Sequence, residues 1–369
     1  MAITAKKFDV HAKTFDREGK QISFETGKLA VQADNSLRVQ FGENVFLVAT
    51  VMEAKPKPDS DFLPLMIDVR ESFSAAGRLG GAAYRRREGR PSDQAILYCR
   101  LIDRALRPMF PKGMINDVVI TVTPLALDQT FDSGVAMMIG SSLSIMAAGI
   151  PFDGPVGAAQ IGYIDEKFII NPTSEEITRS MFNLVVAGKK GTINMIEADG
   201  AEVPADLMKK AFEVGQKAID QSCDFQLEFL KKLDVAKKEI IYNKPSADLI
   251  SFVSNILTKD KLNAMAGNSK VPFNELYSLY EKEAIELCKE HIEDKEKEEF
   301  TEAKVKMAVF AIIKKFIRSR TLETGKRIDD RDVKDIRSLY CEVGLLPRVH
   351  GAGLFRRGDT QVLSTVTLG

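Results

Sequence analysis

The sequence from Gly77 to Pro108, GRLGGAAYRRREGRPSDQAILYCRLIDRALRP, divides into a glycine-rich loop and a helix. Ser92 predicts the start of the helix, because a serine side chain can accept a hydrogen bond from the first-turn backbone, and Pro108 lies just past its end. Apolar residues at helical spacing indicate packing against a core. A second face carries three arginines, Arg100, Arg104 and Arg107. These fit a solvated helix face as well as they fit a ligand-binding face.

The loop before this helix is unusually rich in positive charge. Four arginines lie within the six positions 85–90, and Glu88 is the only acid among them. Clustered like charges favour an anionic partner, and guanidinium groups offer paired donors that match phosphate. An aromatic side chain in the loop is available to stack on a base. We therefore predict a single-stranded nucleic-acid site made of Arg78, Arg85, Arg86, Arg87, Arg90 and Tyr84.

Composition bounds the class of protein. The chain has 369 residues, of which 44% are hydrophobic, so it can bury more than one core. Its formal net charge is +0, which by itself indicates no charged partner, although arginines gather at 78–107 and acids at 281–302. The four cysteines form no CxxC and no disulfide framework, which favours a reducing compartment. The three histidines lie far apart and indicate no zinc site.

No targeting segment is expected. The first residues, MAITAKKFDVHAK, lack the apolar core of a signal peptide. The most apolar run, Val135 to Ile150, is interrupted by glycines and serines and predicts a buried helix rather than a membrane span. We therefore expect a cytoplasmic protein without a membrane partner.

Periodicity predicts a β-rich first part and a helical second part. Apolar or alternating runs predict strands at 46–51, 63–69, 118–122, 181–186 and 193–197. Helices are predicted at about 92–107, 133–148 and 204–233. From about 235 to 322 the pattern becomes helical, with apolar stripes at 249–256 and 305–316. The charged run at 293–300 fits a solvated helix or helix end.

Two distant segments resemble each other. GENVFLVATV (Gly42–Val51) and GDTQVLSTVT (Gly358–Thr367) share a glycine, an acidic residue and an apolar strand after them. A repeat at this distance favours domain duplication, whereas the alternative is a pair of unrelated hairpins.

Several motifs are similar to one known family. ESFSAAGR, RREGRPSDQ and CRLIDRALRPMFPKG, together with the segments Phe24–Val51 and Thr121–Asp132, resemble the first ribonuclease PH-like core of the bacterial polynucleotide phosphorylases, which are polyribonucleotide nucleotidyltransferases. The resemblance implies an α+β fold with mixed β-sheets and packed helices. It divides the chain into a first ribonuclease PH-like core at 1–233, an all-helical domain at 234–323, and a linker with the start of a truncated second core at 324–369.

The resemblance also implies a function. The family degrades single-stranded RNA from 3′ to 5′ with inorganic phosphate, releases nucleoside diphosphates and acts in mRNA decay; Mg²⁺ is the expected metal. The arginine loop corresponds to the family's RNA entrance, although Ala82, Ala83 and Tyr84 stand near the place where the family usually has two phenylalanines. In the linker, Asp330 stands where the family usually has glycine.

The family's catalytic pattern, carried onto this first core, is not preserved. A phosphate-binding serine run falls on Asp132-Ser133-Gly134, and an Asp/Asp/Lys set falls on Ile177, Asn183 and Val185. An acid in the serine run would repel phosphate. We therefore expect no catalytic residue and no metal ligand in this chain, and place Mg²⁺ in the second core beyond it.

The resemblance implies partners as well: single-stranded RNA, further copies of the chain in a homotrimeric ring, and components of an RNA degradosome. The expected role of this portion is RNA entry and assembly within a longer enzyme. The alternative is a non-catalytic RNA-binding or scaffold subunit of an exosome-like ring. A ribonuclease PH subunit fits less well because of the helical domain and the second repeat.

Overall fold

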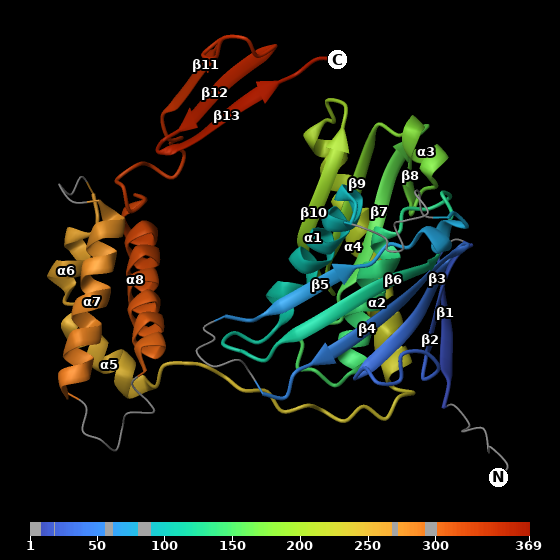
Figure 1. The fold of residues 1–369 in the computed structure, drawn as a ribbon, viewed down its shortest axis with the longest axis horizontal. Coiled ribbons are helices and arrows are strands. Elements are labelled where there is room, and N and C mark those ends of the chain that lie inside the picture. Colours follow the sequence, from blue (N-terminus) through green and yellow to red (C-terminus); the bar gives the residue numbers. More distant parts are fainter. Residues whose placement is uncertain (1–8, 18, 56–61, 80–89, 268–271, 292–300) are drawn as a thin grey trace. The chain divides into compact units, whose positions relative to one another are not determined.

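The computed structural model describes residues 9–17, 19–55, 62–79, 90–267, 272–291 and 301–369. The chain forms two compact units, residues 1–243 and residues 244–369 (Figure 1).

A six-stranded mixed sheet forms the base of the first unit. Its strand order is β1-β2-β3-β4-β6-β5, and all neighbours are antiparallel except β5 and β6, which are parallel. Its inward positions alternate along each strand, so one face is buried and apolar. The strands are β1 (His11–Arg17), β2 (Lys20–Thr26), β3 (Asn35–Phe41), β4 (Asn44–Met52), β5 (Leu65–Val69) and β6 (Val118–Ala126).

A four-stranded antiparallel sheet with the order β10-β9-β7-β8 completes the first unit. Its strands are β7 (Gly157–Ile164), β8 (Lys167–Ile170), β9 (Phe182–Lys189) and β10 (Thr192–Gly200). The helices of this unit are α1 (Asp93–Leu106), α2 (Gly134–Ala147), α3 (Ser174–Arg179) and α4 (Ala205–Leu230), with short 3₁₀ turns η1 (Phe73–Ala76) and η2 (Arg107–Met109). The predicted mixed sheets with packed helices are confirmed.

Helix α2 lies between the two sheets, where it contacts β3 and β4 on one side and β7 on the other. Its residues from Gly134 to Ile145 are all buried, and small side chains let it approach both sheets closely. A Cβ on Gly140 would lie 2.7 Å from the Cγ2 atom of Val39. The buried hydroxyls of this layer are largely satisfied: Ser144 shares a 2.7 Å hydrogen bond with Thr50, and Ser142 accepts one from the Val156 backbone. The predicted buried helix is therefore confirmed.

Helix α4 covers the other face of the second sheet. Its residues Ala211, Ala218 and Ile219 pack against Ile161 and Val186 of β7 and β9. The segment after α4 stays with the first unit: the backbone N–H of Lys238 donates to Gly149, and that of Asn243 donates to Gly113. The compact unit thus extends to residue 243, and the three-part division of the chain stays a prediction.

The two repeated segments both form hairpins with the same turn. Gly42 separates β3 from β4, and Gly358 separates β12 (Gly351–Arg357) from β13 (Thr360–Val366). Both glycines adopt a left-handed backbone, with φ of 62° and 61°, as the first position of a two-residue hairpin loop often requires. Because glycine is common at this position of two-residue hairpin loops, duplication and two unrelated hairpins both remain consistent with the structure.

The second unit begins with a helical cluster. The helices are α5 (Ala247–Ile256), α6 (Lys259–Ala264), α7 (Phe273–His291) and α8 (Glu302–Thr324). The predicted stripe at 305–316 is confirmed, because Val305, Val309 and Ile313 are buried against α5 and α7. The charged run at 293–300 lies outside the described residues.

A three-stranded antiparallel sheet comes next, formed by β11 (Leu339–Val343), β12 and β13. Every residue of β11 and of β13 is exposed, including large apolar side chains such as Val343, Val362 and Val366. This sheet therefore has no hydrophobic core of its own in the described chain.

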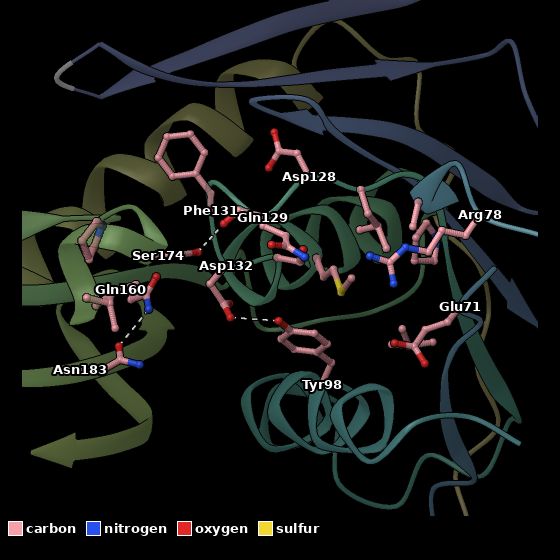
Figure 2. Close-up of a pocket in the computed structure, with 18 residues that line it drawn as sticks. Glu71, Arg78, Tyr98, Asp128, Gln129, Phe131, Asp132, Gln160, Ser174 and Asn183 are labelled. Atoms are coloured by element: carbon pink, nitrogen blue, oxygen red, sulfur yellow. Dashed lines mark hydrogen bonds between the residues drawn. The ribbon is translucent and has the colours of Figure 1, made fainter. Parts of the chain in front are cut away.

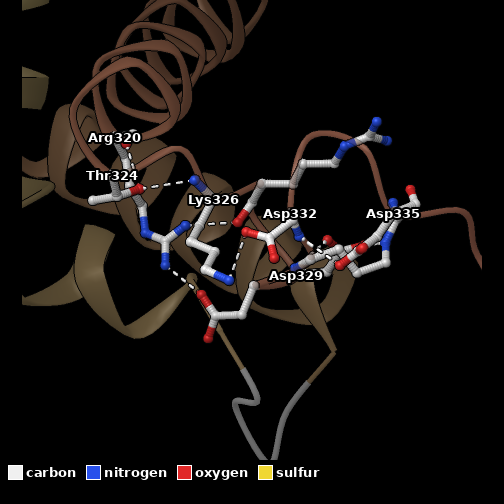
Figure 3. A network of polar contacts seen from close by, with 9 residues as sticks. Arg320, Thr324, Lys326, Asp329, Asp332 and Asp335 are labelled. Atoms are coloured by element: carbon white, nitrogen blue, oxygen red, sulfur yellow. Dashed lines mark hydrogen bonds and ion pairs between the residues drawn. The ribbon is translucent and has the colours of Figure 1, made fainter.

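The linker between α8 and this sheet folds back onto the end of α8 (Figure 3). The Arg320 guanidinium donates to the carbonyl of Arg327 over 2.6 Å and pairs with the carboxylate of Asp330. The N–H of Gly267, which lies just after α6, donates to the carbonyl of Ile328 over 2.8 Å. Asp330 has a φ of 61°, so the residue that stands where the related family has glycine keeps a left-handed backbone.

Candidate functional site

A cavity of about 560 Å³ opens between the two sheets of the first unit, beside the N-terminus of α2 (Figure 2). We call it the amide pocket, after two of its side chains. Residues from η1, α1, α3, β7 and β9 meet around it. The polar side chains that line it are Glu71, Arg78, Tyr98, Asp128, Gln129, Asp132, Ser133, Gln160, Ser174 and Asn183.

An aspartate occupies the N-terminus of α2. Asp132 accepts a hydrogen bond from the backbone N–H of Gly134 over 2.7 Å and one from the hydroxyl of Tyr98 over 2.9 Å. Burial, followed by the negative charge and the hydrogen bond of Asp132, raises the pKa of Tyr98 well above its ordinary value. The carboxylate thus already interacts with the positive end of the helix, where it opposes a second anion such as phosphate.

Two amides face each other on the neighbouring strands β7 and β9. The Nε2 atom of Gln160 donates to the Oδ1 atom of Asn183 over 2.9 Å, and Gln160 is 4% exposed (Figure 2). The backbone N–H of Gln160 is held in turn by the Oδ1 atom of Asn171 over 3.1 Å. A neutral, hydrogen-bonded amide therefore stands at one of the positions where the resembled family has an acid.

The other two positions onto which the resembled family's catalytic pattern falls, Ile177 and Val185, lie in different surroundings. Ile177 of α3 lines the amide pocket and contributes only apolar surface. Val185 of β9 packs against the main hydrophobic core and is not among the residues that line the pocket. The structure therefore brings Ile177 and Asn183 together and leaves Val185 apart.

The amide pocket does not fit a divalent metal. Among the described residues, no three His, Cys, Asp or Glu side chains gather in a way that could hold a metal ion. Asp128, another carboxylate that lines the pocket, accepts hydrogen bonds from Asn44 over 3.0 Å and from the Thr130 backbone over 2.8 Å. Its oxygens are thus used to hold the β3–β4 turn and its own loop.

A second cavity of about 560 Å³ adjoins the amide pocket, with which it shares Glu71 and Arg78. We call it the rim pocket. Two chain segments, on either side of the loop 80–89, form its wall. It is lined by Asp68, Val69, Arg70, Glu71, Ser72, Phe73, Ala76, Arg78, Arg90, Pro91, Ser92 and Leu127.

Two arginines of the predicted nucleic-acid site line the rim pocket. Arg78 and Arg90 are both exposed, and with the residues that the structure describes they form no ion pair. Arg70 differs, because its Nε atom pairs with the carboxylate of Asp68 over 2.6 Å. The rim pocket therefore carries two cations that are available to an anion. The other predicted members, Tyr84 and Arg85 to Arg87, lie outside the described residues.

Two of the arginines predicted on the basic face of the helix, Arg104 and Arg107, are paired with acids, unlike Arg78 and Arg90. Arg104 pairs with Glu197 of β10 over 2.5 Å. Arg107 pairs with Asp103 over 2.7 Å and donates to the carbonyls of Leu63 and Leu65. Arg104 thus ties α1 to β10, and Arg107, the first residue of η2, ties the end of α1 to the segment that begins β5, which supports the structural interpretation for these two arginines.

Sequence reasoning did not single out Phe73. This residue is the first of η1, it lines the rim pocket, and as a whole residue it is 44% exposed. The available signal was its place in the sequence ESFSAAGR, between Arg70 and Arg78.

The two sheets packed around α2 give the first unit a ribonuclease PH-like fold. The chain matches the 3′ exoribonuclease family, domain 1 over residues 18–151 and domain 2 over residues 154–218. It belongs to that family.

Relatives with names lie within the same family. A polyribonucleotide nucleotidyltransferase of Roseiflexus sp. (strain RS-1) is 38% identical over 363 residues, which cover 98% of this chain and 48% of the relative. One of Bacillus subtilis (strain 168) is 38% identical over 359 residues, 97% of this chain and 50% of the relative. The chain thus spans about half the length of these relatives.

Among solved structures, the crystal structure of rice (Oryza sativa) Rrp46 is similar with a TM-score of 0.47 and 14% identity, over 57% of this chain and 94% of that one. In the part of the chain that the structure describes, no helix is long and apolar enough to cross a membrane.

Proposed function

We propose that this chain is the N-terminal part of a phosphorolytic 3′→5′ exoribonuclease, which degrades single-stranded RNA with inorganic phosphate to nucleoside diphosphates. In this proposal the chain contacts entering RNA and contributes assembly surface, and the catalytic acids with their Mg²⁺ lie in a second core. The observation that supports separate places for RNA contact and for catalysis is the pair of adjoining pockets. Among the described residues, one pocket lacks a usable carboxylate set, and the other holds two arginines without an ion pair.

The charge on the rim pocket supports the RNA contact. Arg78 and Arg90 are exposed, and in the sequence they flank the segment that carries Arg85, Arg86 and Arg87. Phosphate groups along a single strand are spaced so that several guanidinium groups can bind successive phosphates, and such contacts are indifferent to base sequence. The names of the relatives support RNA as the polyanion.

The chemistry of the amide pocket supports a non-catalytic role for this core. Phosphorolysis requires a bound phosphate and stabilisation of the leaving oxygen. Asp132 occupies the helix N-terminus that would hold the phosphate, and Gln160 and Asn183 pair with each other. The first core therefore keeps the shape of the site without its chemistry.

The second candidate is a non-catalytic RNA-binding or scaffold subunit of an exosome-like ring, which the absence of a metal-binding set of acids among the described residues of the amide pocket also favours. The reading frame beyond Gly369 distinguishes the two candidates. A frame that continues into an Asp-x5-Asp-x-Lys segment would support the enzyme, and a frame without that segment would support the scaffold.

The RNA contact is tested by changing Arg86, Arg87 and Arg90 together to alanine. Each phosphate contact on a single strand contributes about 0.7 to the slope of log K against log salt, so the slope should flatten by about 2. A matched control changes Lys314, Lys315 and Arg318, three cations of α8. Unchanged affinity and slope in the loop variant, with an unchanged melting temperature, would remove the RNA contact.

A further inference from the structure

The amide pocket holds a buried polar side chain with unused hydrogen-bonding capacity. Gln160 is 4% exposed, and its Nε2 atom donates to the Oδ1 atom of Asn183 over 2.9 Å. The Oε1 atom of Gln160 and the Nδ2 atom of Asn183 have no partner among the residues that the structure describes. Neither is one of the fully enclosed polar atoms that lack a partner, so both are accessible from the cavity that these residues line. A buried amide in this state is completed by water or by a ligand.

The register of the strands fixes the two amides in place. On the paired strands β7 and β9, Gln160 lies opposite Val185 and Asn183 lies opposite Gly162, so both amides project from the same face. Gly162 has no side chain, which leaves room for Gln160 to reach Asn183 diagonally. The backbone N–H of Gln160 donates to the Oδ1 atom of Asn171 over 3.1 Å, which holds this part of β7 in turn. The two amides therefore form a preformed polar surface.

The unused atoms of the pair place a donor beside an acceptor. Asn183 offers N–H groups, and Gln160 offers a carbonyl oxygen. Turning both amides over would exchange these roles between the two residues, so the pattern is the same in either assignment. The Watson–Crick edge of every nucleobase also carries a donor next to an acceptor, and proteins that hold unpaired bases bind them through this edge. The pair is thus complementary to a base edge.

Apolar side chains adjoin the two amides. A Cβ on Gly162, which lies opposite Asn183, would stand 3.4 Å from the Cγ atom of Pro172, so this proline covers the same face of the sheet. Ile177 and Phe131 line the same pocket. Apolar and aromatic surface around a few fixed polar atoms is typical of small-molecule sites, and a cavity of about 560 Å³ has room for a nucleoside.

The charge of the lining opposes an anionic group. Among the described lining residues, Glu71, Asp128 and Asp132 are acids, whereas Arg78 is the one base. Figure 2 shows the amides at one end of the pocket and Arg78 with Glu71 at the other end. A phosphate beside the amides would therefore meet a negative field without a described cation next to it. The uncharged base of a nucleoside meets no such opposition.

We propose that the amide pocket binds a nucleobase, whose Watson–Crick edge places its donor and its acceptor against Gln160 and Asn183. The choice of a nucleobase over another amide-like ligand rests on the proposed function, since a protein that works on RNA encounters bases. The base belongs to a free nucleoside or to an RNA strand, and any phosphate stays outside the pocket. The two amides bind the base and take no part in bond chemistry.

The first test uses the unchanged 369-residue chain and three ligands, measured by isothermal titration calorimetry up to the solubility of each. Adenosine carries both the donor and the acceptor, purine riboside lacks the exocyclic N–H donor, and AMP adds a phosphate to adenosine. The loss of one hydrogen bond should make purine riboside bind about 2- to 12-fold more weakly than adenosine. AMP should bind no more tightly than adenosine, because its phosphate gains no partner in the pocket.

The second test uses variants that locate the ligand. Gln160→Leu removes the acceptor and Asn183→Leu removes the donor at similar side-chain size, and each should weaken adenosine binding by about 2- to 12-fold. The matched control is Gln216→Leu, which removes a part-buried amide of α4 outside the pocket and should leave adenosine binding unchanged. The melting temperature of each variant is recorded. If a pocket variant unfolds, the comparison of purine riboside with adenosine on the unchanged chain decides alone.

Several results would overturn the base site. Equal adenosine affinity in the unchanged chain and in both folded pocket variants would place the ligand elsewhere. No binding of adenosine would show that water alone completes the amides. Purine riboside that binds as tightly as adenosine would show that the base edge is not recognised, and AMP that binds more tightly would show that the pocket accepts an anion.

A competitor identifies the source of the base. Displacement of adenosine by oligo(A) in the unchanged chain, but not by the same ribose–phosphate backbone without bases, shows that a base of the strand enters the pocket. Retention of adenosine shows that the site serves free nucleosides.

The base site and the RNA contact fail separately. If adenosine does not bind while the change of Arg86, Arg87 and Arg90 flattens the salt slope of RNA binding, the base site is wrong and the RNA contact stands. If adenosine binds through the amides while the arginine change has no effect, the RNA contact is wrong and the base site stands.

Discussion

Arg320 holds the linker against the helical cluster, and its removal should free the linker locally. The guanidinium is 19% exposed and makes two contacts, one with the carbonyl of Arg327 and one with the carboxylate of Asp330, which is 47% exposed. A hydrogen bond from a charged donor contributes about 1.5–3 kcal/mol. The half-exposed ion pair adds about 0.5–1 kcal/mol, because solvent screens it.

The change Arg320→Ala should therefore lower the free energy of linker opening by about 2–4 kcal/mol. That difference corresponds to an opening equilibrium about 30- to 700-fold larger. Amide hydrogen exchange measures it directly: the N–H groups of Gly267 and Arg327, which are bonded across the linker, should exchange faster by this factor. Arg320→Lys keeps the positive charge but loses the paired N–H donors of the guanidinium, so the exchange rate should increase less than in Arg320→Ala.

A control on the same helix is Arg318→Ala, which removes an exposed arginine from α8. Its exchange at Gly267 should match that of the unchanged chain. Equal exchange at Gly267 in the Arg320→Ala and unchanged chains would refute the reasoning, because it would show that the backbone turn alone, with Asp330 in its left-handed conformation, holds the linker.

The pockets and the exposed sheet support three more predictions. The 369-residue chain should release no ADP from oligo(A), phosphate and Mg²⁺, because Ile177 and Asn183 supply no acid; ADP above a purified blank would contradict this. Amides of β11–β13 should exchange faster than those of β4 and β6, since the sheet is exposed; equal protection would show that it packs on other parts of the chain. Tyr98 keeps its proton in the folded state to a higher pH than in the unfolded state, where it titrates near 10.0, so stability should fall above that pH by up to about 1.4 kcal/mol per unit. Tyr98→Phe should have a lower free energy of unfolding than the unchanged chain at about pH 8. The difference in free energy between the two chains, measured by urea unfolding, should narrow above about pH 10. A difference that stays constant with pH would show that the titration of Tyr98 does not affect stability.

Local patterns predicted local structure well. Ser92 was expected to cap α1, and its hydroxyl accepts the N–H of Ala95 over 3.1 Å. The buried character of α2 was predicted from its small and apolar residues. In both cases the signal lies within a few turns of the chain, where spacing determines which groups meet.

Contacts between distant segments were beyond reach from the sequence. Asp132 was expected to oppose phosphate, but its hydrogen bond from Tyr98 depends on how α1 packs beside α2. The pairing of Gln160 with Asn183 depends on the register of β7 and β9, which no local pattern specifies. Helical spacing likewise could not show that Arg104 faces Glu197 across the fold.

The same limit applies to Phe73. An isolated phenylalanine in a sequence predicts burial, because most large apolar residues lie inside. Only the fold of η1, in which Ala75 is buried and the N–H of Arg78 donates to the carbonyl of Phe73, shows that this residue lines the rim pocket.

The exposed sheet β11–β13 bears on the order in which the protein matures. The first unit has its own core and can complete folding as soon as it leaves the ribosome, at about 5–20 residues per second of synthesis. The sheet displays apolar side chains and two open edges until another surface covers it, whether from the same chain or from a neighbour. Exposed apolar strands with open edges are prone to mispair with other strands, so we expect this sheet to be the aggregation-prone part of the chain during that interval. The covering step, rather than the folding of the first unit, would then limit the yield of native protein.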